Sequence, residues 1–146
     1  MTGAMTVSHP VSDINRPSVA YSSSAMRLLD GPNYGMLGTL RPTGELQINP
    51  MWFERVEDEI RFTHTATRGK YRNLQQNPTM TLAVLDPADP AHYVELRGRL
   101  VEALPDPTGD FYVRLARRYG KDVQQAPADS ADRVILVMRI ETVTAR

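Results

Sequence analysis

Residues 60–85 read IRFTHTATRGKYRNLQQNPTMTLAVL, and the spacing of apolar residues changes twice within this stretch. Alternation of apolar and polar residues over 60–65 predicts a strand. Apolar residues three apart predict a helix over 68–76, and the Asn77-Pro78 pair that follows is a common helix end. A second apolar run predicts a strand over 80–85. The stretch therefore predicts a strand, a helix and a strand in direct succession.

Short strands and hairpin-type turns dominate the rest of the chain. We expect further strands over 34–40, 45–53, 93–101 and 134–140, a serine-capped helix that begins near Ser22, and an amphipathic helix over 111–119. The first two of these strands are joined by Arg-Pro-Thr-Gly, a sequence typical of tight turns. Gly98 predicts a bulge in the third, and the fourth is apolar on nearly both faces, as in a central strand. The pattern favours a mainly β protein with short helices, whose antiparallel sheet closes into a small barrel.

The composition narrows the class of protein. The chain has 146 residues, with 17 basic and 17 acidic side chains, no cysteine and three histidines. This length suits one domain, which we place at 21–146 after a flexible N-terminal leader at 1–20. Zero net charge argues against nucleic acid as a partner, and no apolar run reaches the ~20 residues that span a membrane, so we expect a cytoplasmic protein. Without cysteine there is no thiolate chemistry, so we expect an enzyme of this composition to rely on a bound cofactor.

The strongest functional signal is a cluster of hydroxyl and cationic residues where the strand passes into the helix. It consists of Thr63, Thr65, Thr67, Arg68, Gly69 and Lys70, with Thr67 placed to cap the helix. Backbone N–H groups at a helix N-terminus attract anions, and the two cationic side chains beside them would bind a phosphate. The alternative is a solvated helix start, but cations there oppose the helix dipole by ~0.3–1 kcal/mol each. We therefore predict an anion site, inside a segment (61–80) that holds four cationic residues and no acid.

A second signal lies in the strand over 45–53. Gln47, Asn49 and Met51 share one face of it, while Pro50 has no N–H to donate, so the strand must be unpaired or bulged there. Unpaired backbone groups beside these polar side chains could hydrogen-bond a planar heterocycle. The alternative is an edge strand whose proline blocks aggregation. The residues alone do not decide between these two interpretations.

Weaker signals have simpler interpretations. The three histidines lie far apart without a second metal ligand at a usual spacing, so no metal site is predicted. His64 shares a strand face with apolar neighbours, which favours a hydrogen-bonded core histidine over a catalytic one. Arg114, Arg117 and Arg118 fall on the polar side of the last helix, where they form a solvated face or, alternatively, bind an anionic tail.

Five segments of the chain together resemble one family. They are Gly38-Thr-Leu-Arg-Pro-Thr-Gly44, Asn49-Pro-Met-Trp-Phe53, Arg68-Gly-Lys-Tyr-Arg-Asn-Leu74 with Asn77-Pro78, Val84-Leu-Asp-Pro87 and Tyr93-Val-Glu-Leu-Arg-Gly-Arg99. On these segments, the chain from about residue 25 to 145 resembles the pyridoxamine 5'-phosphate oxidase-like split-barrel superfamily. Within it, the chain is most similar to the flavin/deazaflavin oxidoreductases, which use coenzyme F420 and less often FMN. The resemblance implies an FMN-binding split β-barrel fold and a homodimer with cofactor sites at the subunit interface.

The resemblance also implies roles for individual residues. Those implied to hold the cofactor phosphate are Arg68 and Lys70, assisted by Thr65 and Thr67. Those implied to line the flavin or deazaflavin ring are Gln47, Asn49, Pro50 and Met51, and those implied to close the site are Asn77, Pro78 and Met80. Two departures limit the carry-over. Gln75-Gln76 replaces a basic pair that would bind a polyglutamyl tail, and the short C-terminus argues against pyridoxamine-phosphate oxidase activity itself.

The function implied by the resemblance is hydride transfer from reduced F420 to a small organic acceptor. The acceptors in question are conjugated enones, quinones, tetrapyrroles and polyketide intermediates of the tetracycline type, the last belonging to antibiotic biosynthesis. One alternative is an FMN-dependent oxidoreductase of the same fold, because FMN needs the same phosphate site. The other is a non-catalytic module that binds or stores a flavin. The sequence does not identify the acceptor or the proton donor.

Overall fold

The computed structural model describes residues 5–6 and 19–146. Its elements are β1 (Met5–Thr6), α1 (Ser23–Asp30), β2 (Gly35–Leu40), β3 (Leu46–Met51), β4 (Glu54–Val56), β5 (Glu59–Thr65), α2 (Gly69–Gln76), β6 (Thr79–Leu85), β7 (Tyr93–Pro105), α3 (Asp110–Arg118), a 3-10 turn (Ser130–Asp132) and β8 (Arg133–Ala145). The predicted strand–helix–strand order over 60–85 is confirmed in β5, α2 and β6. The predicted helix after Ser22 is confirmed too, and the Ser22 Oγ accepts the Ala25 N–H at 3.1 Å.

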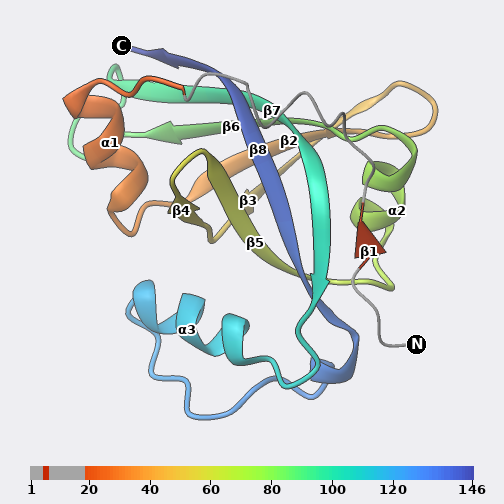
Figure 1. The fold of residues 1–146 in the computed structure, drawn as a ribbon. Helices are drawn as coiled ribbons and strands as arrows, with labels where there is room; N and C mark the ends of the chain where they lie inside the picture. The colour runs from red at the N-terminus through yellow and green to blue at the C-terminus, as the bar shows by residue number, and fades with distance from the viewer. Residues whose placement is uncertain (1–4, 7–18) are drawn as a thin grey trace.

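All strand pairs are antiparallel and belong to one sheet. The strand order is β3-β2-β6-β7-β8-β5-β4, and β1 adds to β7. In Figure 1 the long strands β7 and β8 cross the sheet, and α3 lies below the sheet in this view, far from α2. The expected class, mainly β with three short helices, is confirmed, and so is the central position of β8 between β7 and β5.

Three elements differ from the sequence-based expectation. β4 was not predicted, because its three residues carry no alternating apolar pattern and are held by pairing with β5. β7 and β8 are longer than expected, with thirteen residues each. The predicted bulge at Gly98 is confirmed as a register shift, since Arg97 pairs with Thr142 but Gly98 pairs with Ile140.

The predicted flexible leader, residues 1–20, falls largely on residues 1–4 and 7–18, which lie outside the described residues. The parts that the structure describes contact the sheet. Met5–Thr6 pairs with Ala103 and Glu102 of β7, and the Val19 N–H donates to Asp58 at 3.3 Å.

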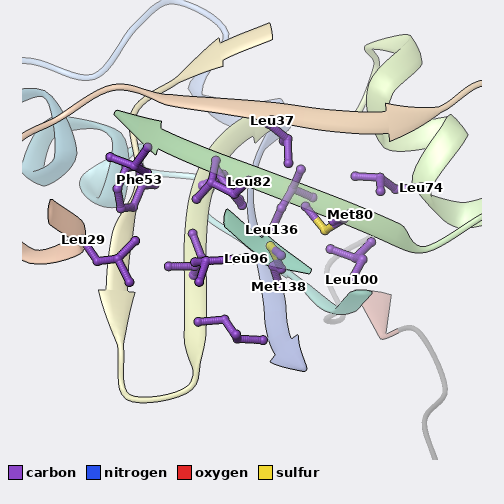
Figure 2. Close-up of a cluster of buried hydrophobic side chains, with 14 of the residues drawn as sticks. Leu29, Leu37, Phe53, Leu74, Met80, Leu82, Leu96, Leu100, Leu136 and Met138 are labelled. Atoms are coloured by element: carbon purple, nitrogen blue, oxygen red, sulfur yellow. The ribbon is translucent and has the colours of Figure 1, made fainter. Parts of the chain in front are cut away.

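One hydrophobic core fills the space that the curved sheet encloses with α1 and α2. Figure 2 shows Leu29 of α1, Leu37 of β2 and Leu74 of α2 pointing toward side chains from β6, β7 and β8. These core side chains are fully buried. Buried and partly exposed residues alternate along most of β5. One face of this strand therefore joins the core, while the other stays accessible for a binding site.

Arg118 of α3 corrects the expectation of a solvated arginine face. Its guanidinium donates to the carbonyls of Gly31 at 2.8 Å, Asp30 at 3.1 Å and Leu29 at 3.3 Å, and to that of Phe53 at 3.1 Å. The side chain therefore joins α3 to the last carbonyls of α1, which have no partner within that helix. Arg114 and Arg117 remain largely exposed, in contact with Glu54 and the Val123 carbonyl.

We predict that Arg118→Ala lowers the free energy of unfolding by about 2–3 kcal/mol, because it removes charge-assisted hydrogen bonds and leaves carbonyl groups without a donor. Arg117→Ala is the matched control. Arg117 lies on the same helix, and its side chain donates to one backbone carbonyl, that of Val123. Urea unfolding of the two variants measures the difference. Equal stability of the two variants would contradict the role given to Arg118.

Candidate functional site

A cavity of about 800 Å³ opens between β3, β5, the start of α2 and the start of β8. Its wall is formed by Arg41, Pro42, Gln47, Asn49, Pro50, Met51, Thr63, His64, Thr65, Arg68, Gly69, Lys70, Asn73 and Arg133. We call it the cationic cavity, because its wall holds four basic side chains and no acid.

Most of the predicted site residues meet in this wall, although they come from separate elements. The ones that do are Gln47, Asn49, Pro50, Met51, Thr63, Thr65, Arg68, Gly69 and Lys70. The two signals in the sequence, the hydroxyl–cation cluster and the polar face of β3, thus line the same cavity. That these residues bind a cofactor stays a prediction.

Four predicted residues lie outside the wall: Thr67, Asn77, Pro78 and Met80. The expectation that Thr67 caps α2 is wrong, because the N-cap is Arg68 and no side chain caps the helix. The Arg68 N–H donates to the Thr65 carbonyl at 3.2 Å, and this turn delays the helix by one residue. Met80 is 0% exposed in the core, and its part in closing the site stays a prediction.

Asn77 and Pro78 connect α2 to the sheet. The Asn77 Oδ1 accepts the Thr79 N–H at 3.1 Å, and the Pro78 carbonyl accepts the Leu100 N–H at 2.8 Å. Their contribution to a site, as implied by the resemblance, remains a prediction that would need a second copy of the chain beside them.

Lys70 is a buried cation without a strong partner among the described residues. Its side chain lies in the wall with 8% of the residue exposed, and its Nζ is 3.5 Å from the Met51 Sδ, a weak acceptor. Burial, and next the charge of Arg68, lower the pKa of the Lys70 ammonium. A buried ammonium is costly unless an anion pairs with it, so this position fits an anionic ligand.

Two cations of the wall were missed by the sequence analysis. Arg133 opens β8, where it faces Thr65 across the β5–β8 pair, and its Nη1 lies 3.3 Å from the Thr63 Oγ1. It is also paired with Asp129 at 3.2 Å and lies over the Tyr112 ring at 4.6 Å. Arg41 belongs to the turn between β2 and β3. Arg133 can be assigned to the wall only from the register of the sheet. Arg41 was interpreted as part of a turn, so its charge was not considered.

His64 differs in part from the expected hydrogen-bonded core histidine. It is buried as predicted, with 8% exposed, but it lines the cationic cavity and its Nε2 has no hydrogen-bond partner. Burial, and then the charges of Lys70, Arg68 and Arg133, lower the pKa of the imidazole to about 4. The Thr65 Oγ1 and Asn49 Oδ1 are also buried in this wall without a partner. Buried polar atoms without partners are rare, so these three atoms fit contacts with a ligand.

Pro50 lies on an edge strand, as one of the two interpretations predicted. The expectation that the strand is unpaired or bulged at Pro50 is wrong, because a proline on an edge strand needs no N–H for a second neighbour. β3 pairs with β2 alone among the described strands, and the pairing continues through Pro50 opposite Met36 without a bulge. On one face of β3, Gln47 and Asn49 border the cavity. On the other face, Leu46 and Ile48 are exposed.

The cavity can hold an anionic group between α2 and β8, and a flat polar group against β3. Among the described residues, no three His, Asp or Glu side chains are grouped to hold a metal ion. No described helix is both long and apolar enough to cross a membrane.

The antiparallel sheet and its cationic cavity define a class of small-molecule-binding β proteins, and the comparisons identify the family. The family model described as pyridoxamine 5'-phosphate oxidase matches residues 23–146, so the chain belongs to this family. The predicted family and its split-barrel fold are confirmed. None of the curated proteins matches the chain.

Solved structures support this assignment. The chain is 44% identical to an F420 reductase, over 85% of this chain and 98% of that one, with a TM-score of 0.82. General Stress Protein 26 from Bacillus anthracis str. Sterne is 17% identical over 84% of this chain and 90% of that one, with a TM-score of 0.65. The conserved hypothetical protein Rv2991 from Mycobacterium tuberculosis is 19% identical over 89% and 87% of the two chains, with a TM-score of 0.67. The last two likenesses concern the fold alone.

Proposed function

We propose that this protein is an F420H2-dependent reductase that transfers a hydride to a small organic acceptor. The observation that carries the proposal is the 44% identity to an F420 reductase over nearly the whole of that chain. The cationic cavity supports it, because a deazaflavin coenzyme combines a phosphate with a flat ring. Conjugated enones, quinones, tetrapyrroles and polyketide intermediates are the acceptors to be tried.

The residues of the cavity fit such a coenzyme. In the proposal, Arg68, Lys70 and the uncapped N–H groups of α2 hold the phosphate, and the Thr65 hydroxyl donates to it. Gln47 and Asn49 orient the ring, since the buried Asn49 Oδ1 needs an N–H donor that a flavin-type ring has. When bound, the reduced coenzyme supplies the hydride. The chain's own contribution is to bind, to orient the ring and to keep water away from its β3 side.

A fluorescence titration with F420 and with FMN tests the choice of coenzyme. We expect F420 to bind at least tenfold more tightly, a difference of about 1.4 kcal/mol. Tighter FMN binding, with a yellow flavin retained through purification, would replace the proposal by an FMN-dependent oxidoreductase. F420 binding without turnover of any acceptor class would favour a storage module instead.

We also propose that the protein is a homodimer formed through the outer face of β2, β3 and β6. Leu46 and Ile48 are 77% and 62% exposed on this face. They border an apolar groove of about 370 Å³ that Met36, Leu40 and Ala83 help to line. Exposed apolar patches of this kind indicate an interaction surface, and the edge position of β3 would bring a second copy next to the cationic cavity.

We predict that Ile48→Lys weakens the dimer roughly 30-fold, because it removes buried apolar area and adds a charge at the interface. Light scattering coupled to gel filtration over a dilution series measures the change. Val56→Lys is the matched control, since Val56 is also a partly exposed apolar residue, on β4 at the far end of the strand order. A wild-type monomer at high concentration would refute the dimer.

A further inference from the structure

The His64 imidazole is a buried titratable group in the wall of the cationic cavity. Three positive charges of the same wall act on it electrostatically: Lys70 of α2, Arg68 of the turn before α2 and Arg133 of β8. Two acids stand near Arg133: the Asp129 carboxylate accepts from its guanidinium, and Asp132 precedes it in the chain, with its backbone carbonyl bonded to the Ala66 N–H. No acid of the described residues lines the wall itself. Protonating the imidazole would therefore add a fourth positive charge to three that lie close together.

The same geometry leaves the Nε2 of His64 available. The atom is buried and has no hydrogen-bond partner, and the neighbouring Thr65 Oγ1 is in the same state. A neutral imidazole nitrogen can accept or donate one hydrogen bond, whereas the imidazolium donates from both nitrogens. Protonation would thus make Nε2 a donor in every case and give it the positive charge that strengthens a hydrogen bond to an anion in the cavity.

We propose that His64 is a ligand-binding residue of the cationic cavity and takes up a proton when a divalent anion binds there. The anion compensates the three surrounding cations, so the imidazolium is no longer repelled and gains a negatively charged acceptor. The inference rests on the anion site of the proposed function but not on its deazaflavin chemistry, so an inorganic anion tests it separately.

The sign of the effect follows from linkage. An anion that favours the protonated imidazole raises the pKa of His64 from about 4 in the ligand-free protein. Binding therefore strengthens as the pH falls through the raised pKa and stops strengthening below the ligand-free pKa. If the pKa rises by two units, affinity at pH 5 exceeds that at pH 8 by about tenfold.

Sulfate is the probe of choice, because it stays divalent over this whole range of pH. Proton NMR of the histidine ring protons, titrated from pH 4 to pH 8 with and without saturating sulfate, measures the pKa of His64 in the wild-type protein. His64→Gln assigns its signals. We expect a rise of at least one unit with sulfate, and an unchanged pKa would overturn the proposal.

The affinity for sulfate as a function of pH is the second measurement. We expect the tightening toward pH 5 in the wild-type protein and in His92→Gln, and its loss in His64→Gln. His92 is the matched control, because it lies exposed on a loop beside Asp89. The same pH dependence in His64→Gln would overturn the proposal. Sulfate binding with the expected linkage but no F420 binding would uphold the proposal and reject the deazaflavin function.

Discussion

Replacing Lys70 with methionine should weaken F420 binding by about 100-fold while the protein stays folded. The Nζ of Lys70 belongs to a buried residue of the cavity wall, and among the described residues its hydrogen-bond partner is the Met51 sulfur at 3.5 Å. A charge-assisted hydrogen bond to a phosphate is worth about 1.5–3 kcal/mol, and its strength rises where water is excluded. Methionine keeps the volume of the side chain and removes a buried charge, so the variant should not unfold at a lower temperature.

Arg68→Ala should weaken binding less, by about tenfold, because Arg68 is exposed and its charge is screened by solvent. Arg72→Met is the matched control: Arg72 is an exposed cation on the same helix and lies outside the cavity wall. Its affinity for F420 should stay within twofold of the wild type. Fluorescence titration at one ionic strength compares the variants, and circular dichroism checks their folding. Unchanged affinity in both Lys70→Met and Arg68→Ala would remove the anion site.

The elements that the sequence predicted are those whose signal is local. The change of period within 60–85 reports on β5, α2 and β6, because each of them buries one face of its own residues. β4 has no such signal, since its intermediate to exposed residues are ordered by the register of β5. The ends of β7 and β8 were missed for the same reason. The ends of the two strands are held by pairing with each other beyond their apolar parts. The sequence of one strand alone does not show this pairing.

The site residues, too, were predicted where their signal is local and missed where it depends on strand pairing. Arg68 and Lys70 were predicted because the anion-binding residues stand side by side in the chain. Arg133 was missed because it is 63 positions from Lys70, and only the β5–β8 pairing places it in the wall. For His64 the strand parity was correct, but the strand ends at Thr65, so the histidine faces the cavity at the edge of the core. Parity specifies a face of the sheet and not where the core stops.

Replacing Gly98 with alanine should lower the free energy of unfolding by about 4 kcal/mol, at the upper end of the effects of single substitutions. A Cβ at this position would lie 1.8 Å from the Arg139 carbonyl oxygen and 2.9 Å from its carbon. Both are backbone atoms of β8, so no side chain can move aside. Relief requires β7 and β8 to separate at the bulge, where Glu141 is the extra residue.

The separation would affect more than the bulge itself. β7 and β8 lie at the centre of the strand order, and the core side chains Leu96, Leu100 and Met138 come from this pair. Gly69→Ala is the matched control, because no atom lies within 4 Å of a Cβ there and its backbone φ is not positive. That variant should be as stable as the wild type or up to about 1 kcal/mol more stable, since alanine restricts the unfolded chain. Urea unfolding distinguishes the two outcomes. A Gly98→Ala variant as stable as Gly69→Ala would mean that the backbones of β7 and β8 do not lie as close together at Gly98 as this bulge requires.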